Sequence, residues 1–130
     1  KPNMQPAHLF EYAVVRVVPK VEREEFLNVG VIVYCRELSF LQVMYSLNEE
    51  RLQIFCTQID KQELLQNLQS VDRICKGSED AGPIGNLDIA GRFRWLTATR
   101  STIIQTSKVH PGFCTDPHET LTRLYTQLVL

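Results

Sequence analysis

Hydrophobic positions in the first third of the chain follow the alternation of β-strands. Residues 8–19 and residues 40–47 each place apolar side chains at every second position. Between them, residues 28–36 are apolar and rich in β-branched side chains on both faces, which is typical of a central strand. Because short links join consecutive segments, the pattern predicts an antiparallel meander.

The period then changes to that of helices. Asn48 is placed to cap a short helix, because two glutamates follow it and favour the positive end of the helix dipole. Asp60, with a glutamate three residues later, starts a longer helix whose leucines have helical spacing up to Gly77. Asp116 followed by Pro117 begins a last helix with its own apolar stripe.

Two further segments complete the expected order. Residues 77–88 are punctuated by glycine and proline and predict a loop, and residues 101–107 predict a fourth strand. The order β-β-β-α-loop-β-α indicates an α+β fold, in which a single antiparallel sheet of about four or more strands is covered by two helices. A length of 130 residues fits one domain, residues 1–130.

Composition narrows the class of protein. The formal net charge is -1, which excludes nucleic-acid binding driven by the field of the whole molecule and leaves room only for a local patch. Apolar runs fall short of the ~20 residues that a membrane span needs. The first residues lack the pattern of a secretory signal, so we expect a cytoplasmic location.

Cysteine and histidine spacing does not favour a metal site or a nucleophile. None of the four cysteines forms a C-x-x-C pair, and buried free thiols are expected. His110, Cys114 and His118 are spaced four apart, but prolines and a glycine interrupt any helix there, and structural zinc prefers four ligands in tight pairs. No nucleophile-elbow pattern accompanies Cys114 or His110. We therefore expect no catalytic residues, metal or other cofactor.

A basic stretch, "RFRWLTATRSTIIQTSKVHPG" (residues 92–112), is the main candidate for chemistry. It contains four cations and no acidic residue: Arg92, Arg94, Arg100 and Lys108. If the segment is extended, Arg92 and Arg94 project to one side, with the aromatic residues beside them on the other.

Arg100 precedes two hydroxyl residues, Ser101 and Thr102. A guanidinium beside hydroxyl and amide donors is the grouping that binds phosphate or carboxylate. The alternative interpretation is structural: the arginines pair with the acidic cluster at residues 22–25 and lie along Trp95.

Much of the chain resembles a bacterial family of unknown function, DUF family 3037. The segments that carry the resemblance are "YAVVRVVPKVEREEFLNVGVIVYC" (residues 12–35) and the basic stretch followed by "DPHETLTRLYTQLV". What the resemblance implies is context: relatives are often encoded beside a HipA-like kinase, a class known from toxin–antitoxin modules. It implies no activity.

We expect the two segments to meet at one end of the sheet and to form an anion-binding or partner-binding site. The candidate residues are Arg23, Asn28, Arg92, Arg94, Arg100, Ser101, Thr102 and His110. The function expected first is a non-catalytic binding or regulatory subunit that docks on a partner protein, with a HipA-like kinase as the partner. The alternative is a nucleotide-binding or nucleic-acid-binding module that uses residues 92–108.

Overall fold

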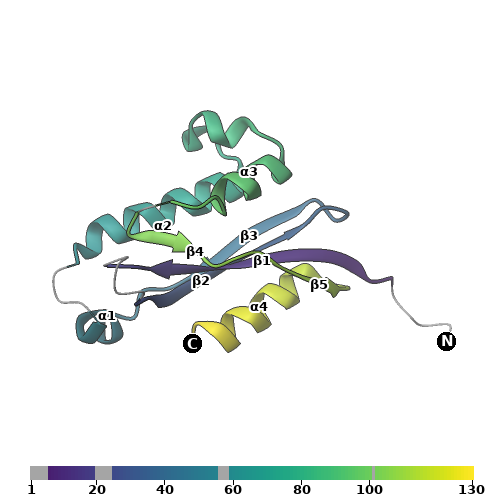
Figure 1. The fold of residues 1–130 in the computed structure, drawn as a ribbon. Helices are drawn as coiled ribbons and strands as arrows, with labels where there is room; N and C mark the ends of the chain where they lie inside the picture. The colour runs from purple at the N-terminus through teal and green to yellow at the C-terminus, as the bar shows by residue number, and fades with distance from the viewer. Residues whose placement is uncertain (1–5, 20–24, 56–58, 101) are drawn as a thin grey trace.

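The protein folds as a helix–sheet–helix sandwich. The computed structural model describes residues 6–19, 25–55, 59–100 and 102–130. In Figure 1, helices α2 and α3 lie over one face of the sheet and α4 lies under the other. The elements, in chain order, are β1 (His8–Val17), β2 (Leu27–Cys35), β3 (Phe40–Tyr45), α1 (Glu49–Phe55), α2 (Lys61–Lys76), the 3-10 turns η2 (Glu79–Ala81) and η3 (Pro83–Asn86), α3 (Ile89–Leu96), β4 (Ile104–Thr106), β5 (His110–Cys114) and α4 (Pro117–Leu128).

The sheet is antiparallel throughout and has the order β3-β2-β1-β4. Strand β5 also pairs with β1, so β4 and β5 share one edge of β1: β4 pairs with residues 15–17 and β5 with residues 8–12. This arrangement confirms the expected α+β class and the single antiparallel sheet.

Three local expectations differ from the structure. The segment around Arg92 and Arg94 is helix α3 and not an extended chain, because Asp88 caps it by accepting a hydrogen bond from the Gly91 main-chain N–H at 2.8 Å. The fourth strand is shorter than residues 101–107, and a fifth strand follows at His110–Cys114. The described residues contain four α-helices, whereas we expected two helices to cover the sheet.

The other helices begin and end where local signals place them. The carboxylates of Asp60 and Asp116 each accept hydrogen bonds from main-chain N–H groups in the first turn of α2 and α4. Helix α2 ends at Gly77, whose φ of 64° is the left-handed conformation that favours glycine. None of the described helices is both long enough and apolar enough to cross a membrane.

Two hydrophobic clusters lie on opposite faces of the sheet. One, beneath α2 and α3, includes Ile32, Leu64 and Phe93. The other, above α4, includes Val33 and Leu121. Strand β2 contributes buried side chains to both clusters, which confirms the prediction of a central strand.

A β-bulge in β2 changes which residues face α4. Val15 pairs with Gly30 and Arg16 pairs with Asn28, so Val29 is the extra residue. The shift turns Asn28 toward the C-terminal end of α4, where its side chain donates to the Leu128 carbonyl at 3.1 Å. The bulge therefore links the sheet to the last helix.

Candidate functional site

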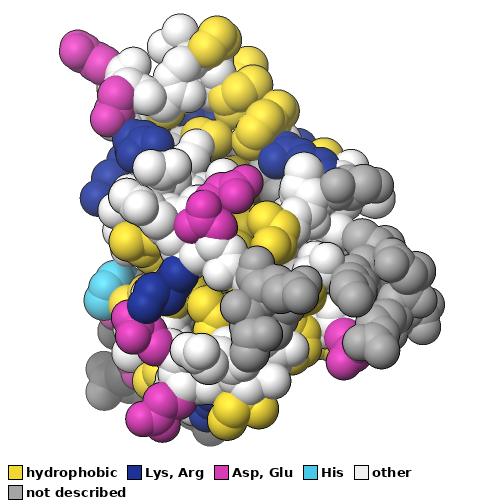
Figure 2. Space-filling view, turned by 90° about the vertical axis from the view of Figure 1, so that its left-hand side faces the viewer, with side chains coloured by type: hydrophobic (Ala, Val, Ile, Leu, Met, Phe, Trp, Pro, Cys, Tyr) yellow, Lys and Arg dark blue, Asp and Glu magenta, His cyan; other side chains and the backbone are white. Residues whose placement is uncertain are grey.

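The basic stretch does not form one surface. Arg92 is buried, Arg94 is exposed on the same helix, and Arg100 lies beyond the end of that helix. Each of these guanidinium groups binds a different part of the protein. On the face that Figure 2 shows, the described basic side chains appear as separate patches with acidic and neutral side chains between them.

Arg94 forms a surface ion pair with strand β1. Its Nη1 and Nη2 donate to the two carboxylate oxygens of Glu11 at 2.9 and 2.8 Å. The Arg94 side chain is 57% exposed, so the pair is screened by water. The hydrogen bonds that Arg94 donates to the Glu11 carboxylate raise the pKa of Arg94. Arg94 is thus held by a carboxylate of the protein itself.

Arg100 packs against Trp95. Its Cζ lies 3.7 Å from the centre of the Trp95 ring, and its Nη2 donates to the Trp95 carbonyl. Burial lowers the pKa of Arg100. The neighbouring Thr102 donates from Oγ1 to the Ile104 carbonyl at 2.6 Å, and Ser101 lies outside the described residues. The contacts described for Arg100 and Thr102 are therefore with residues close to them in the sequence.

Asn28 and Thr102 lie near the same end of the sheet. Arg16 lies between Asn28 and Gln105 in the sheet, and its Nε donates to the Asn28 side-chain oxygen at 3.3 Å. Arg94, by contrast, binds Glu11 toward the other end of β1. The described members of the candidate set are therefore not gathered in one pocket.

His110 and Arg23 complete the candidate set. The His110 ring lies 5.2 Å from the Tyr12 ring, on the neighbouring strand. Arg23 lies outside the described residues, so its place relative to the others is not defined.

Arg92 has a different environment. It is 9% exposed, and its Nη1 donates to the carbonyls of Ile74 and Cys75, both at 3.0 Å, at the C-terminal end of α2. A cation there is favoured by the negative end of the helix dipole. Its Nε is buried and has no hydrogen-bond partner among the described residues.

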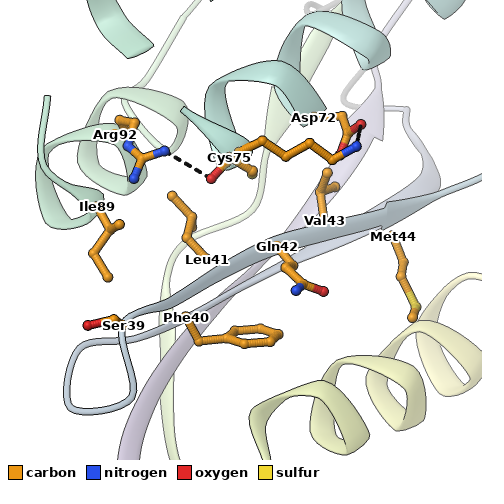
Figure 3. A pocket seen from close by; sticks show the side chains of 11 residues that line it. Ser39, Phe40, Leu41, Gln42, Val43, Met44, Asp72, Cys75, Ile89 and Arg92 are labelled. Carbon is orange, nitrogen blue, oxygen red and sulfur yellow. Dashed lines mark hydrogen bonds and ion pairs between the residues drawn. The ribbon is translucent and has the colours of Figure 1, made fainter. Parts of the chain in front are cut away.

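Arg92 lines a groove of about 590 Å³ beside strand β3. Consecutive residues Ser39–Met44 line it, and Figure 3 shows Leu41 directed toward α2 while Phe40 and Gln42 point the other way. Helices α2 and α3 provide the remaining lining residues: Asp72, Cys75, Lys76, Ile89 and Arg92. The groove thus runs along the outer edge of the sheet, with Arg92 toward the β2–β3 hairpin.

The edge of β3 carries unpaired main-chain groups. Among the described residues, β3 pairs with β2 alone. The Ser46 N–H donates to the Val29 carbonyl at 2.9 Å, which sets the alternation of hydrogen-bonded pairs along the ladder. Leu41, Val43 and Tyr45 therefore direct their N–H and C=O groups away from β2, along the groove.

The chemistry of the buried thiols does not indicate a nucleophile. Burial raises the pKa of Cys75 to about 12 and also raises the pKa of Cys114. A raised pKa keeps a thiol protonated and unreactive at neutral pH. Cys35, Cys75 and Cys114 are free, as expected, while Cys56 lies outside the described residues. Within the described ranges, no group of three or more His, Cys, Asp or Glu side chains is arranged to hold a metal ion.

The groove was not among the sequence-based candidates, apart from Arg92. One signal was present in the sequence: "FLQVMY" (residues 40–45) contains no charge and no proline, which is unusual for a strand at the edge of a sheet. That signal becomes informative only when the strand is known to be at an edge.

Comparison with known proteins gives a family and no activity. A family model described as "Protein of unknown function (DUF3037)" matches residues 12–129. No curated protein and no solved structure matches the chain.

Proposed function

Because the chain belongs to the DUF3037 family of proteins of unknown function, its relatives supply no activity, and we propose from its own geometry that it is a non-catalytic docking module. It takes an extended segment of a partner protein as an additional strand along β3. The observation that carries this proposal is the row of main-chain groups at Leu41, Val43 and Tyr45 that have no partner strand among the described residues, along a strand that lines a groove. Strand addition of this kind draws its affinity from main-chain hydrogen bonds and its specificity from pockets for alternate side chains.

The contrast between the two edges of the sheet supports the proposal. On the far edge, β4 has only three residues and β5 contains Pro111 and Gly112, which limit pairing with another chain. Strand β3 has six residues and none of these protective features. An unprotected edge invites aggregation unless a partner covers it, so its retention here fits a binding role.

The partner proposed first is a HipA-like kinase, and its support is the family resemblance described above. The nucleic-acid alternative has weaker support, because Arg94 and Arg100 already bind Glu11 and Trp95 and Arg92 is buried. A binding surface for phosphates needs several cations that face solvent together.

The experiment compares two variants at one position. Val43→Pro removes an outward N–H that the added strand needs, whereas Val43→Ala removes the same side-chain packing and keeps the N–H. We expect the Ala variant to co-purify with the co-expressed kinase and the Pro variant to lose it. Hydrogen exchange should show that the partner protects the amides of Leu41, Val43 and Tyr45.

Two results would count against this function. Separate elution of the two proteins at micromolar concentration removes the kinase as the partner. Equal binding by the Pro and Ala variants, with no new amide protection in β3, overturns docking at this edge.

A further inference from the structure

Arg92 is a buried cation whose described partners are uncharged. Its Nη1 binds two main-chain carbonyls, its Nε has no partner among the described residues, and only 9% of the residue is exposed. A buried charge is costly unless it is paired and its donors are satisfied. The dipole of α2 offsets part of this cost, and an anion would offset the rest.

The acidic side chain in the groove is already engaged. Asp72 lines the groove, but its carboxylate binds Lys76 at 2.9 Å, one helical turn along α2. Figure 3 shows this ion pair at the opposite end of the groove from Arg92. An anion for Arg92 is therefore more readily supplied by a bound segment than by this pair.

Resting on the docking function proposed above, we propose that the docked segment runs antiparallel to β3 and carries an Asp or Glu side chain that binds Arg92. The Leu41 side chain faces α2 and α3, and its main-chain N–H and C=O groups point away from β2. A residue paired with Leu41 in an added strand places its own side chain on the same face as the Leu41 side chain. In Figure 3 that is the face on which the Arg92 guanidinium lies.

The geometry also gives the position of the acidic residue within the segment. Every pairing in the described sheet is antiparallel, and we take the added strand to follow that pattern. The residue opposite Val43 then comes two positions before the acidic residue, and its side chain lies next to the apolar Val43 side chain, on the same face of the sheet. The recognised pattern is apolar, any residue, then Asp or Glu.

A second copy of this chain does not fit the site. Pairing β3 with β3 would bring the sequence "FLQVMY" into the groove, and it contains no acidic residue. Such a dimer would satisfy the main-chain groups and leave Arg92 without a carboxylate. The occupant is therefore an acidic segment of another protein.

The test uses a library of displayed random peptides selected against the full chain, followed by synthetic peptide pairs that differ only by Glu→Gln at the enriched position. We expect selected sequences to share the apolar–any–acidic pattern, and Gln peptides to bind at least about tenfold more weakly, the range typical of a hydrogen bond to a charged group. Val43→Pro should abolish binding and Val43→Ala should preserve it. An amidated C-terminus on the peptide should make no difference.

Arg92→Lys and Arg92→Met test the residue directly. Because Arg92 also binds the end of α2, both variants are first checked for folding by circular dichroism. The deciding measurement is then the ratio of affinities for the Glu and Gln peptides, which should fall toward one in the Met variant while weaker but edge-dependent binding remains. If neither variant folds, the Glu/Gln ratio measured on the unmodified protein decides.

Each of the other outcomes overturns a specific part of the proposal. Peptides that depend on the β3 edge but bind equally with Glu or Gln overturn the role of Arg92 and leave docking intact. Loss of binding on amidation assigns the carboxylate to a chain terminus and overturns the side-chain pattern. A selection that yields no peptide sensitive to Val43→Pro overturns both the docking function and this inference.

Discussion

Ser107 bonds to Val14 with both its side chain and its main chain. The Val14 N–H donates to the Ser107 hydroxyl at 2.9 Å, and the Ser107 N–H donates to the Val14 carbonyl at 2.8 Å. Ser107 lies between β4 and β5, so these two bonds continue the ladder across the interruption. Ser107 thus joins β4 and β5 into one nearly continuous neighbour of β1.

Substitution of Ser107 should show how much this link contributes. Ser107→Ala leaves the buried Val14 N–H without an acceptor, and we expect a loss of about 1–3 kcal/mol in the free energy of unfolding. Ser107→Thr keeps the hydroxyl and should lose less. Urea denaturation of the three proteins measures the difference, and equal stability of the Ala variant and the unmodified protein would contradict the link.

Gly77 is required for two reasons that a double-mutant cycle can separate. Its φ is 64°, and a Cβ at this position would collide with Nη1 of Arg92. Gly77→Ala should therefore cost more than the ~1–2 kcal/mol expected for a left-handed backbone alone. In an Arg92→Ala background the added cost should shrink to the backbone part. A cost that is the same in both backgrounds would mean that the guanidinium moves aside freely. Chemical denaturation supplies all four values.

Arg100→Ala should have a modest effect on stability. The stacked cation contributes about 0.5–1 kcal/mol at an exposed site, and its removal should increase exposure of the Trp95 ring. Trp95 is the sole tryptophan, so its emission spectrum reports on the change directly. Lys108→Ala, an exposed change, is the control and should leave the emission unaltered. A loss of about 3–5 kcal/mol would instead indicate a buried carboxylate partner for Arg100.

Alkaline pH should destabilise the protein partly through Cys75. Burial, with the nearby carboxylate of Asp72, raises the pKa of this thiol from its usual 9.0 to about 12. Above pH 9.0 the unfolded chain loses a proton that the folded protein keeps, so stability falls as pH rises toward about 12. The slope from this group is at most about 1.4 kcal/mol per pH unit. Unfolding measured over that range should show a shallower decline in Cys75→Ala, and parallel curves would contradict the assignment.

Elements with local signals were predictable from the sequence. Strand β2 was evident because it is apolar on both faces, and α2 and α4 were evident because Asp60 and Asp116 cap them. Helix α3 was missed because Arg and aromatic residues alternate in "RFRW", which imitates a strand, whereas its real signal is the cap at Asp88. Strand β5 was missed because proline and glycine argue against a strand except at an edge.

The candidate site was harder to predict than these elements, because it depends on tertiary structure. The sequence indicated Arg92 as an anion-binding residue, but no local pattern reveals that its side chain lies beneath the end of α2. The groove exists because β3 has a neighbouring strand on one side alone among the described residues, and this depends on the strand order of the whole sheet. Arg94 and Arg100 were indistinguishable from Arg92 in the sequence, and their partners separate them.

The position of β1 in the sheet has a consequence for synthesis of the protein. Val14 and Ser107 are 93 residues apart in sequence, and β1 obtains its second neighbour only from residues 104–114. On the ribosome, β1 and β2 can pair early, but the other edge of β1 stays open until residues 104–114 have emerged. Such distant pairings slow folding, and an open edge in a nascent chain is a site for aggregation. A chain cut short before residue 104 would keep that edge permanently exposed, beside the unprotected edge of β3.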